Sequence, residues 1–191
     1  MWLELGADRC PGASMIDESS YWKRDLLNEA RSLEKRKRQK RWPDAALARC
    51  EQTVMLGFYS IRKLVESGKL TDRTANHSVR VQSYSSNGNT VHFMNRHRIE
   101  EIYEMETPEA RSVPLLFLCN QVIHSYTFIL LLGPDAGLHG ILVTSDRQRS
   151  KELLQVDVDD NVDVFRRVGN DEVVSMEGSR PSKGDWVFKR A

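Results

Sequence analysis

The spacing of apolar residues divides the chain into a helical first part and a strand-rich second part. Over residues 19–41, apolar side chains recur every three to four positions, which predicts an amphipathic helix. Pro43 ends this helix, because the residue before a proline is pushed out of the helical conformation. A second helix is predicted over 44–67, closed by Gly68. Two long helices joined by a short turn pack most simply as an antiparallel hairpin.

Gly57 interrupts the apolar stripe of the second predicted helix. The stripe is otherwise spaced at three and four residues and consists of Leu47, Cys50, Val54, Ile61 and Leu64. A stripe position without a side chain lets another helix come unusually close. We therefore expect close packing of a second element against Gly57.

The pattern changes after residue 77. Alternating residues over 78–94, with an Asn-Gly pair at 87–88, predict a β-hairpin. A short helix is predicted over 96–106, and a further helix begins at Thr107-Pro108-Glu109, where a cap, a proline and an acid follow one another. Over 115–125 this helix is apolar almost all round, which indicates the central, most buried helix of the fold.

The remaining residues contribute mostly short strands. Strands are predicted over 126–132, 140–145, 152–158, 173–176 and 186–188, whereas 160–168 fits either a strand or a short helix. The predicted fold class is α+β, in which an N-terminal long helical hairpin and a buried central helix pack with a small, mostly antiparallel sheet. We expect a loose leader over 1–18 and a single domain over 19–191, helix-rich over 19–125 and strand-rich over 126–191.

Composition and length favour a protein of a reducing compartment. The sequence has 191 residues and three cysteines, which form no CxxC pair and are interpreted as buried thiols. The opening residues lack the basic and apolar regions of a signal peptide. Residues 113–132 carry no charge, but polar side chains occupy their centre, so we expect a buried helix running into a strand and no membrane contact. The predicted location is cytoplasmic.

The near-neutral total charge conceals two oppositely charged regions. The chain has 28 basic and 27 acidic residues, yet 23–49 holds ten basic and four acidic residues, and 151–177 holds three basic and eight acidic ones. The basic excess peaks at the end of the first helix, in Lys35, Arg36, Lys37, Arg38, Lys40 and Arg41. This helix end predicts contact with RNA or DNA through phosphates. A solvated helix end, internal pairing with the acidic half, or contact with an acidic protein or a second copy stay open as alternatives.

Asn120 and His124 are the candidate catalytic pair, because they lie one turn apart on an otherwise apolar helix. Such groups need hydrogen-bond partners, either in a core network or in a site where the imidazole acts as an acid, a base or a phosphate ligand. No metal or cofactor is predicted. The acidic stretch 157–163 lacks the glycine and the final glutamate of a calcium loop, and the five histidines do not pair at metal-binding spacing.

A long helical hairpin followed by the sequence LCNQVIHS resembles the HEPN superfamily. Members of that superfamily are helical bundles, often dimeric, and many cleave RNA in toxin and defence systems. Their motif is an arginine, a polar residue, three to five further residues and a histidine. The corresponding positions here are Cys119, Asn120 and His124, so the arginine is missing. The resemblance covers 20–125 and implies a member that binds without cutting, because cysteine lacks the charged fork that holds a phosphate.

Two functional hypotheses follow. The first is a non-catalytic binding or regulatory protein of a bacterial or mobile-element defence or toxin–antitoxin type, dimeric through its apolar helix, which contacts nucleic acid through the basic helix end. The second is a metal-independent HEPN-like ribonuclease that uses His124 as acid and base and Asn120 as a positioning group. In that case another residue must replace the missing arginine, and Arg111 and Arg62 are the candidates.

Overall fold

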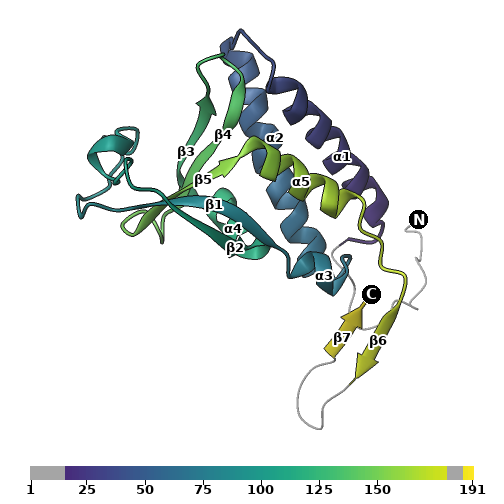
Figure 1. Cartoon of the computed structure of the whole chain (residues 1–191). Coiled ribbons are helices and arrows are strands. Elements are labelled where there is room, and N and C mark those ends of the chain that lie inside the picture. Colours follow the sequence, from purple (N-terminus) through teal and green to yellow (C-terminus); the bar gives the residue numbers. More distant parts are fainter. Residues whose placement is uncertain (1–15, 180–186) are drawn as a thin grey trace, which may run out of the picture.

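A computed structural model describes residues 16–179 and 187–191 (Figure 1). The expected leader lies outside the described residues as far as residue 15, and Ile16 is already part of the hydrophobic core. Helices α1 (Ser19–Arg36) and α2 (Asp44–Glu66) form the predicted hairpin. The prediction that the first helix continues to residue 41 is wrong, because residues 37–43 form the loop between the two helices. No helix of the described residues is long and apolar enough to span a membrane.

Five strands form one antiparallel sheet. They are β1 (Ser78–Ser85), β2 (Glu109–Pro114), β3 (Ser125–Leu132), β4 (Leu138–Ser145) and β5 (Glu152–Asp157), and they lie side by side in the order β2-β1-β5-β4-β3. Every neighbouring pair is antiparallel. The predicted α+β fold class is therefore confirmed, and β2 and β3 are the outer strands of the sheet.

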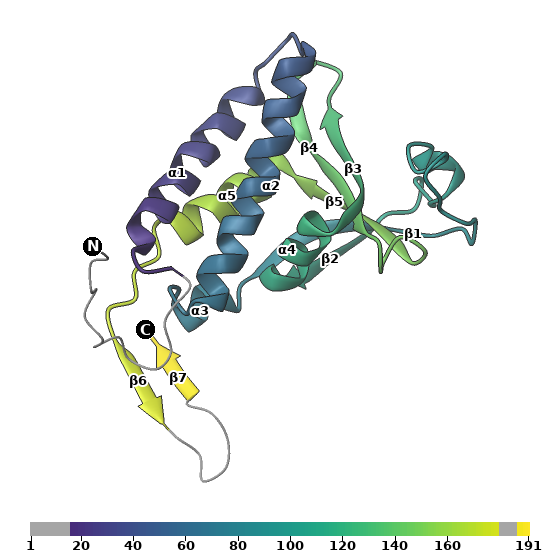
Figure 2. The same ribbon diagram turned by 180° about the vertical axis from the view of Figure 1, so that it is seen from behind.

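The helices cover one face of this sheet, as the two views of the chain show (Figures 1 and 2). Helices α4 (Leu115–Ile123) and α5 (Val158–Gly169) contact both the sheet and the helical hairpin. Residues 160–168 thus belong to a helix, whose apolar side is Val158, Val162, Phe165 and Val168. The close approach at Gly57 is confirmed, because a Cβ atom there would overlap the Phe165 ring.

The opposite face is covered in part by the long connection between β1 and β2. It places Val91, Ile102 and Tyr103 against Leu142 and Leu153 of the sheet. The predicted hairpin over 78–94 is wrong, since β1 pairs with β2 and β5 and no strand follows at 90–94. The predicted helix over 96–106 is also wrong, apart from a single 3-10 turn, η1 (Ile99–Glu101).

The helix predicted to start at residue 107 begins instead at Leu115. Residues 109–114 are strand β2, in which Val113 pairs with Val79 of β1. Local capping signals favoured a helix here, but pairing with a buried strand outweighs local preference. Pro114 then separates the strand from α4, which is the predicted buried central helix.

Asp171 ties the segment after α5 to the short helix α3 (Asp72–Ala75). Its carboxylate accepts hydrogen bonds from the Thr71 backbone N–H at 2.8 Å, the Thr71 hydroxyl at 2.6 Å and the Thr74 hydroxyl at 2.5 Å. Beyond it, β6 (Met176–Ser179) and β7 (Val187–Arg190) form a two-stranded sheet, each starting a little later than predicted. Trp186, the predicted start of the last strand, lies outside the described residues.

Candidate functional site

A cleft of about 610 Å³ opens beside the C-terminal end of α4. Helix α2, helix α4 and the turn after β4 form its walls. Most of the residues that line it are polar, and they are Arg62, Phe117, Asn120, Gln121, His124, Ser145, Asp146, Arg147 and Gln148. The cleft therefore contains both members of the predicted pair, Asn120 and His124, and two arginines from distant parts of the chain.

His124 is held by a hydrogen bond to an arginine. It caps the C-terminus of α4 and is exposed, and its Nε2 lies 3.2 Å from an NH1 nitrogen of Arg62. A guanidinium can only donate, so Nε2 is the acceptor in this hydrogen bond. Arg62 in turn donates from Nε to Glu66 at 2.7 Å. The glutamate, one helical turn further along, thereby fixes the direction of the guanidinium.

Asn120 offers a buried acceptor in the same cleft. Its Oδ1 is buried and receives no hydrogen bond from the described residues. An unpaired buried carbonyl of this kind costs about 1–3 kcal/mol, and such groups concentrate at functional sites. A ligand that carries a hydroxyl or amine donor would satisfy it.

Gln121, the neighbour of Asn120, has a structural role that the sequence did not reveal. It is buried, and its Oε1 accepts from the backbone N–H of Ser145 at 3.0 Å. This bond joins α4 to the end of β4 at the wall of the cleft. Arg147 and Gln148 follow directly in the turn after β4. The only sequence signal for these two was a run of polar residues at 145–150.

Cys119 lies away from the cleft. Its side chain is fully buried, and this burial raises the pKa of the thiol to about 12, so it stays protonated at neutral pH. Arg62, one of the two candidate replacements for the missing arginine, places its guanidinium beside His124. Arg111, the other candidate replacement, is paired with Glu152 between β2 and β5 and does not line the cleft.

Of the six basic residues predicted at the end of the first helix, only Lys35 and Arg36 belong to α1, and the other four lie in the loop before α2. The six are divided between the protein interior and solvent. Arg36 is only 8% exposed and its guanidinium lies 5.7 Å from the centre of the Trp42 ring. Lys37 pairs with Asp159 of α5, and Lys40 contacts Asp135. Lys35, Arg38 and Arg41 are exposed and have no acidic partner among the described residues. Internal pairing with acidic residues of the second half thus accounts for part of the basic run.

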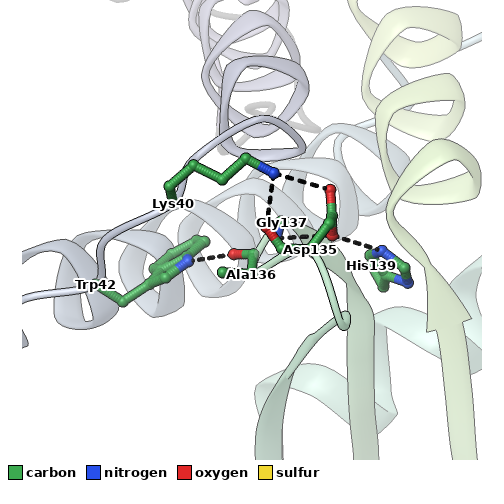
Figure 3. Close-up of polar contacts among 6 residues, drawn as sticks. All are labelled: Lys40, Trp42, Asp135, Ala136, Gly137 and His139. Carbon is green, nitrogen blue, oxygen red and sulfur yellow. Dashed lines mark hydrogen bonds and ion pairs between the residues drawn. The ribbon is translucent and has the colours of Figure 1, made fainter.

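The turn between β3 and β4 holds the loop between α1 and α2 (Figure 3). Lys40 donates to the carbonyl oxygen of Asp135 and Trp42 to that of Ala136, each at 2.7 Å. The backbone N–H of Gly137, followed by Lys40, holds the pKa of Asp135 below its usual 3.8. The carboxylate is therefore charged at neutral pH, and its ion pair is lost only as the pH falls through that lowered pKa.

Among residues 16–179 and 187–191, no group of three or more histidine, cysteine and acidic side chains could hold a metal ion. The acidic stretch at 157–163 forms the start of α5. Asn161 within it is buried and donates to the carbonyl oxygens of Val156 and Asp157. The acidic residues whose spacing is similar to that of a calcium-binding loop therefore lie in the first turns of a helix.

Comparison of the chain with protein-family models, with curated proteins and with solved structures found no match. The resemblance to the HEPN superfamily therefore depends on the motif residues alone, and a functional interpretation depends on the geometry of the cleft.

Proposed function

We propose that the protein is a nucleic-acid-binding protein that holds a backbone phosphate in the cleft between Arg62, His124 and Arg147. The supporting observation is the hydrogen bond between Arg62 and His124 at the mouth of a polar cleft. An arginine fork binds phosphate oxygens in pairs, and a histidine beside it adds a further donor when protonated. A regulatory role in bacterial or mobile-element defence, as the HEPN resemblance implies, belongs to the same proposal.

The exposed basic residues Lys35, Arg38 and Arg41, at the end of α1 and in the loop that follows it, would extend this proposed surface. Asp44 is the first residue of α2 and lies next to the basic run, whereas Arg62 lies 18 residues further along the same helix. With a rise of about 1.5 Å per residue, the cleft and the basic run are about 27 Å apart along α2. A short ligand would occupy only one of them, whereas an extended strand of nucleic acid would contact both. Lys35, Arg38 and Arg41 would then add salt-dependent affinity.

Binding of labelled single-stranded RNA, single-stranded DNA and duplex DNA, followed by fluorescence anisotropy at several salt concentrations, tests the proposal. We expect binding at low salt, and Arg62→Ala should lower the affinity by on the order of tenfold and reduce the salt dependence by about one counterion. Arg80→Ala is the matched control, because Arg80 is also an acid-paired arginine but lies on β1, outside the cleft.

Two outcomes would contradict the proposed cleft. One is the absence of binding to any of the three nucleic acids at low salt. The other is equal affinity of the Arg62→Ala and Arg80→Ala variants. Loss of affinity on replacing Lys35, Arg38 and Arg41 by serine, with Arg62→Ala unchanged, would assign binding to the helix end alone.

A metal-independent ribonuclease is the second candidate function. It is favoured by the presence in one cleft of a guanidinium, an amide and an imidazole, the groups of the HEPN motif, with Arg62 in place of the missing arginine. His124 Nε2 would take the proton of a ribose 2′-hydroxyl, whose oxygen attacks the adjacent phosphorus while the bond to the 5′-oxygen breaks. Arg62 would leave Nε2 to neutralise the phosphate oxygens, and the 5′-oxygen would take a proton from water.

Incubation of RNA with the protein in the presence of EDTA separates the two candidates. A ribonuclease of this kind leaves a 2′,3′-cyclic phosphate, spares DNA, which lacks the 2′-hydroxyl, and loses cleavage by a factor of about 10²–10⁴ in His124→Ala. Cleavage that survives His124→Ala at full rate would reject this mechanism. RNA binding without cleavage would leave the binding function as the one supported.

A further inference from the structure

Strand β3 leaves an unprotected sheet edge. It is the outermost strand on its side, and its sequence SYTFILLL has no charged residue. The opposite outer strand, β2, carries Glu109, Arg111 and Pro114, which discourage pairing with another strand. An apolar outer strand without such protection is a template for further strand pairing.

Apart from those of β4, hydrogen bonds from the described residues reach only the beginning of β3. Arg96 donates to the carbonyl oxygen of Tyr126, and the Thr127 hydroxyl donates to the carbonyl oxygen of Arg96, both at 3.4 Å. From Phe128 to Leu132, no other element of the described residues forms a hydrogen bond to the strand except its partner β4. The free segment is therefore the five residues 128–132.

The free segment carries partly exposed apolar side chains on both faces of the sheet. Phe128 and Leu130 pack at the margin of the core under the helices, and Ile129 and Leu131 pack at the margin of the core on the other face. Leu132 is 42% exposed. A strand added at this edge would complete both cores at once.

We propose that β3 pairs antiparallel with β3 of a second copy of the chain, so that two five-stranded sheets form one continuous sheet. When a strand pairs with its own copy across a two-fold axis, any charge near the axis faces the same charge of the other copy. Strand β3 has no charged residue, so this repulsion is absent. A two-fold axis near Leu130 places Leu132 of each copy beside Phe128 of the other. The same axis brings Asp135, beyond the end of the strand, toward Arg96 at the start of the other copy's strand. The half-exposed Asp135 carboxylate, which Lys40 and His139 contact in its own copy, thereby gains a further cation at both ends of the interface.

This interface differs from the apolar helix that the sequence favoured for a dimer. Helix α4 turns its apolar side into its own domain, and Leu116, 38% exposed, is the large apolar residue that it leaves at the surface. Leu116 and Leu132 therefore form a matched pair of leucines with nearly equal exposure, one on each candidate interface.

Sedimentation analysis of the full chain, from micromolar to hundreds of micromolar, tests the proposal. We expect the unmodified protein to dimerise and Leu116→Lys to dimerise equally well. Leu132→Lys should weaken dimerisation by about tenfold or more, because it buries an unpaired charge in each half of the interface. A protein that is monomeric throughout this range, or a Leu132→Lys variant that dimerises like the unmodified chain, would overturn the proposal, as would a monomer produced by Leu116→Lys alone.

Hydrogen exchange of the unmodified protein provides a test that needs no variant. Across the concentration range of dimerisation, amides within 128–132 should exchange more slowly as the dimer forms, while those of α4 stay constant. A dimer that forms without added protection in 128–132 would contradict strand pairing. Since neither measurement involves nucleic acid, its outcome is independent of the proposed binding function.

Discussion

Replacement of Phe165 by alanine is expected to lower the free energy of unfolding by about 3–5 kcal/mol. Phe165 of α5 is completely buried, and its ring meets Phe58 of α2 edge to face with the ring centres 5.5 Å apart. The same ring fills the space left by Gly57. Its removal opens a cavity where the helical hairpin, α5 and the sheet meet, and rigid neighbours on several sides limit relaxation.

Urea unfolding monitored by circular dichroism measures this effect. Phe93→Ala is the control, because Phe93 is 68% exposed and its loss should change stability by less than about 0.5 kcal/mol. Gly57→Ala should itself destabilise the protein by about 1–3 kcal/mol by overpacking, and should cost much less in the Phe165→Ala background. If Gly57→Ala lowered the free energy of unfolding equally in both backgrounds, the Phe165 ring would not be what excludes a side chain at position 57.

Replacement of Asp171 by alanine is the second substitution with a large expected effect, a loss of about 2–3 kcal/mol of stability. It removes one carboxylate that accepts three hydrogen bonds from Thr71 and Thr74. The Thr74 hydroxyl would then be left without an acceptor at a residue that is buried. Helix α3 would lose its tie to the segment after α5, so its amides should also exchange faster.

Two further variants sharpen this measurement. Asp171→Asn keeps the shape but turns one acceptor into a donor, so it should lose part of the stability that alanine loses. Asp163→Ala removes an exposed aspartate of the same region and should change stability little. A loss below about 0.5 kcal/mol for Asp171→Ala would mean that solvent replaces the three hydrogen bonds at no cost.

The helical hairpin and three of the strands could be predicted from the sequence because their periodicity is local. Strands β3, β4 and β5 lie within two residues of their predicted bounds, and Gly57 indicated the close approach that Phe165 makes. Strand β2 could not be predicted, because residues 107–109 carry every local sign of a helix start. Its conformation is decided by pairing with β1, which starts some thirty residues earlier.

The candidate site was predictable only where its residues share one helix. Asn120 and His124 stand one turn apart, so their spacing predicted that they would lie together. Arg62 stood only as one of two alternatives, because its position beside His124 depends on how α2 packs against α4. The basic run could not be divided into buried and exposed members, because Asp135 and Asp159, which pair with Lys40 and Lys37, come about a hundred residues later.

The packing of α1 against α5 also sets an order of events during synthesis. Leu26, Ala30 and Leu33 of α1 are buried in the finished fold, and α1 makes extensive contact with α5. More than a hundred residues separate the ends of these helices, so a ribosome adding about 5–20 residues per second needs several seconds or more between them. Throughout that interval the apolar face of α1 has not yet met α5. We expect chaperones that recognise apolar helix faces to bind the nascent chain first at α1.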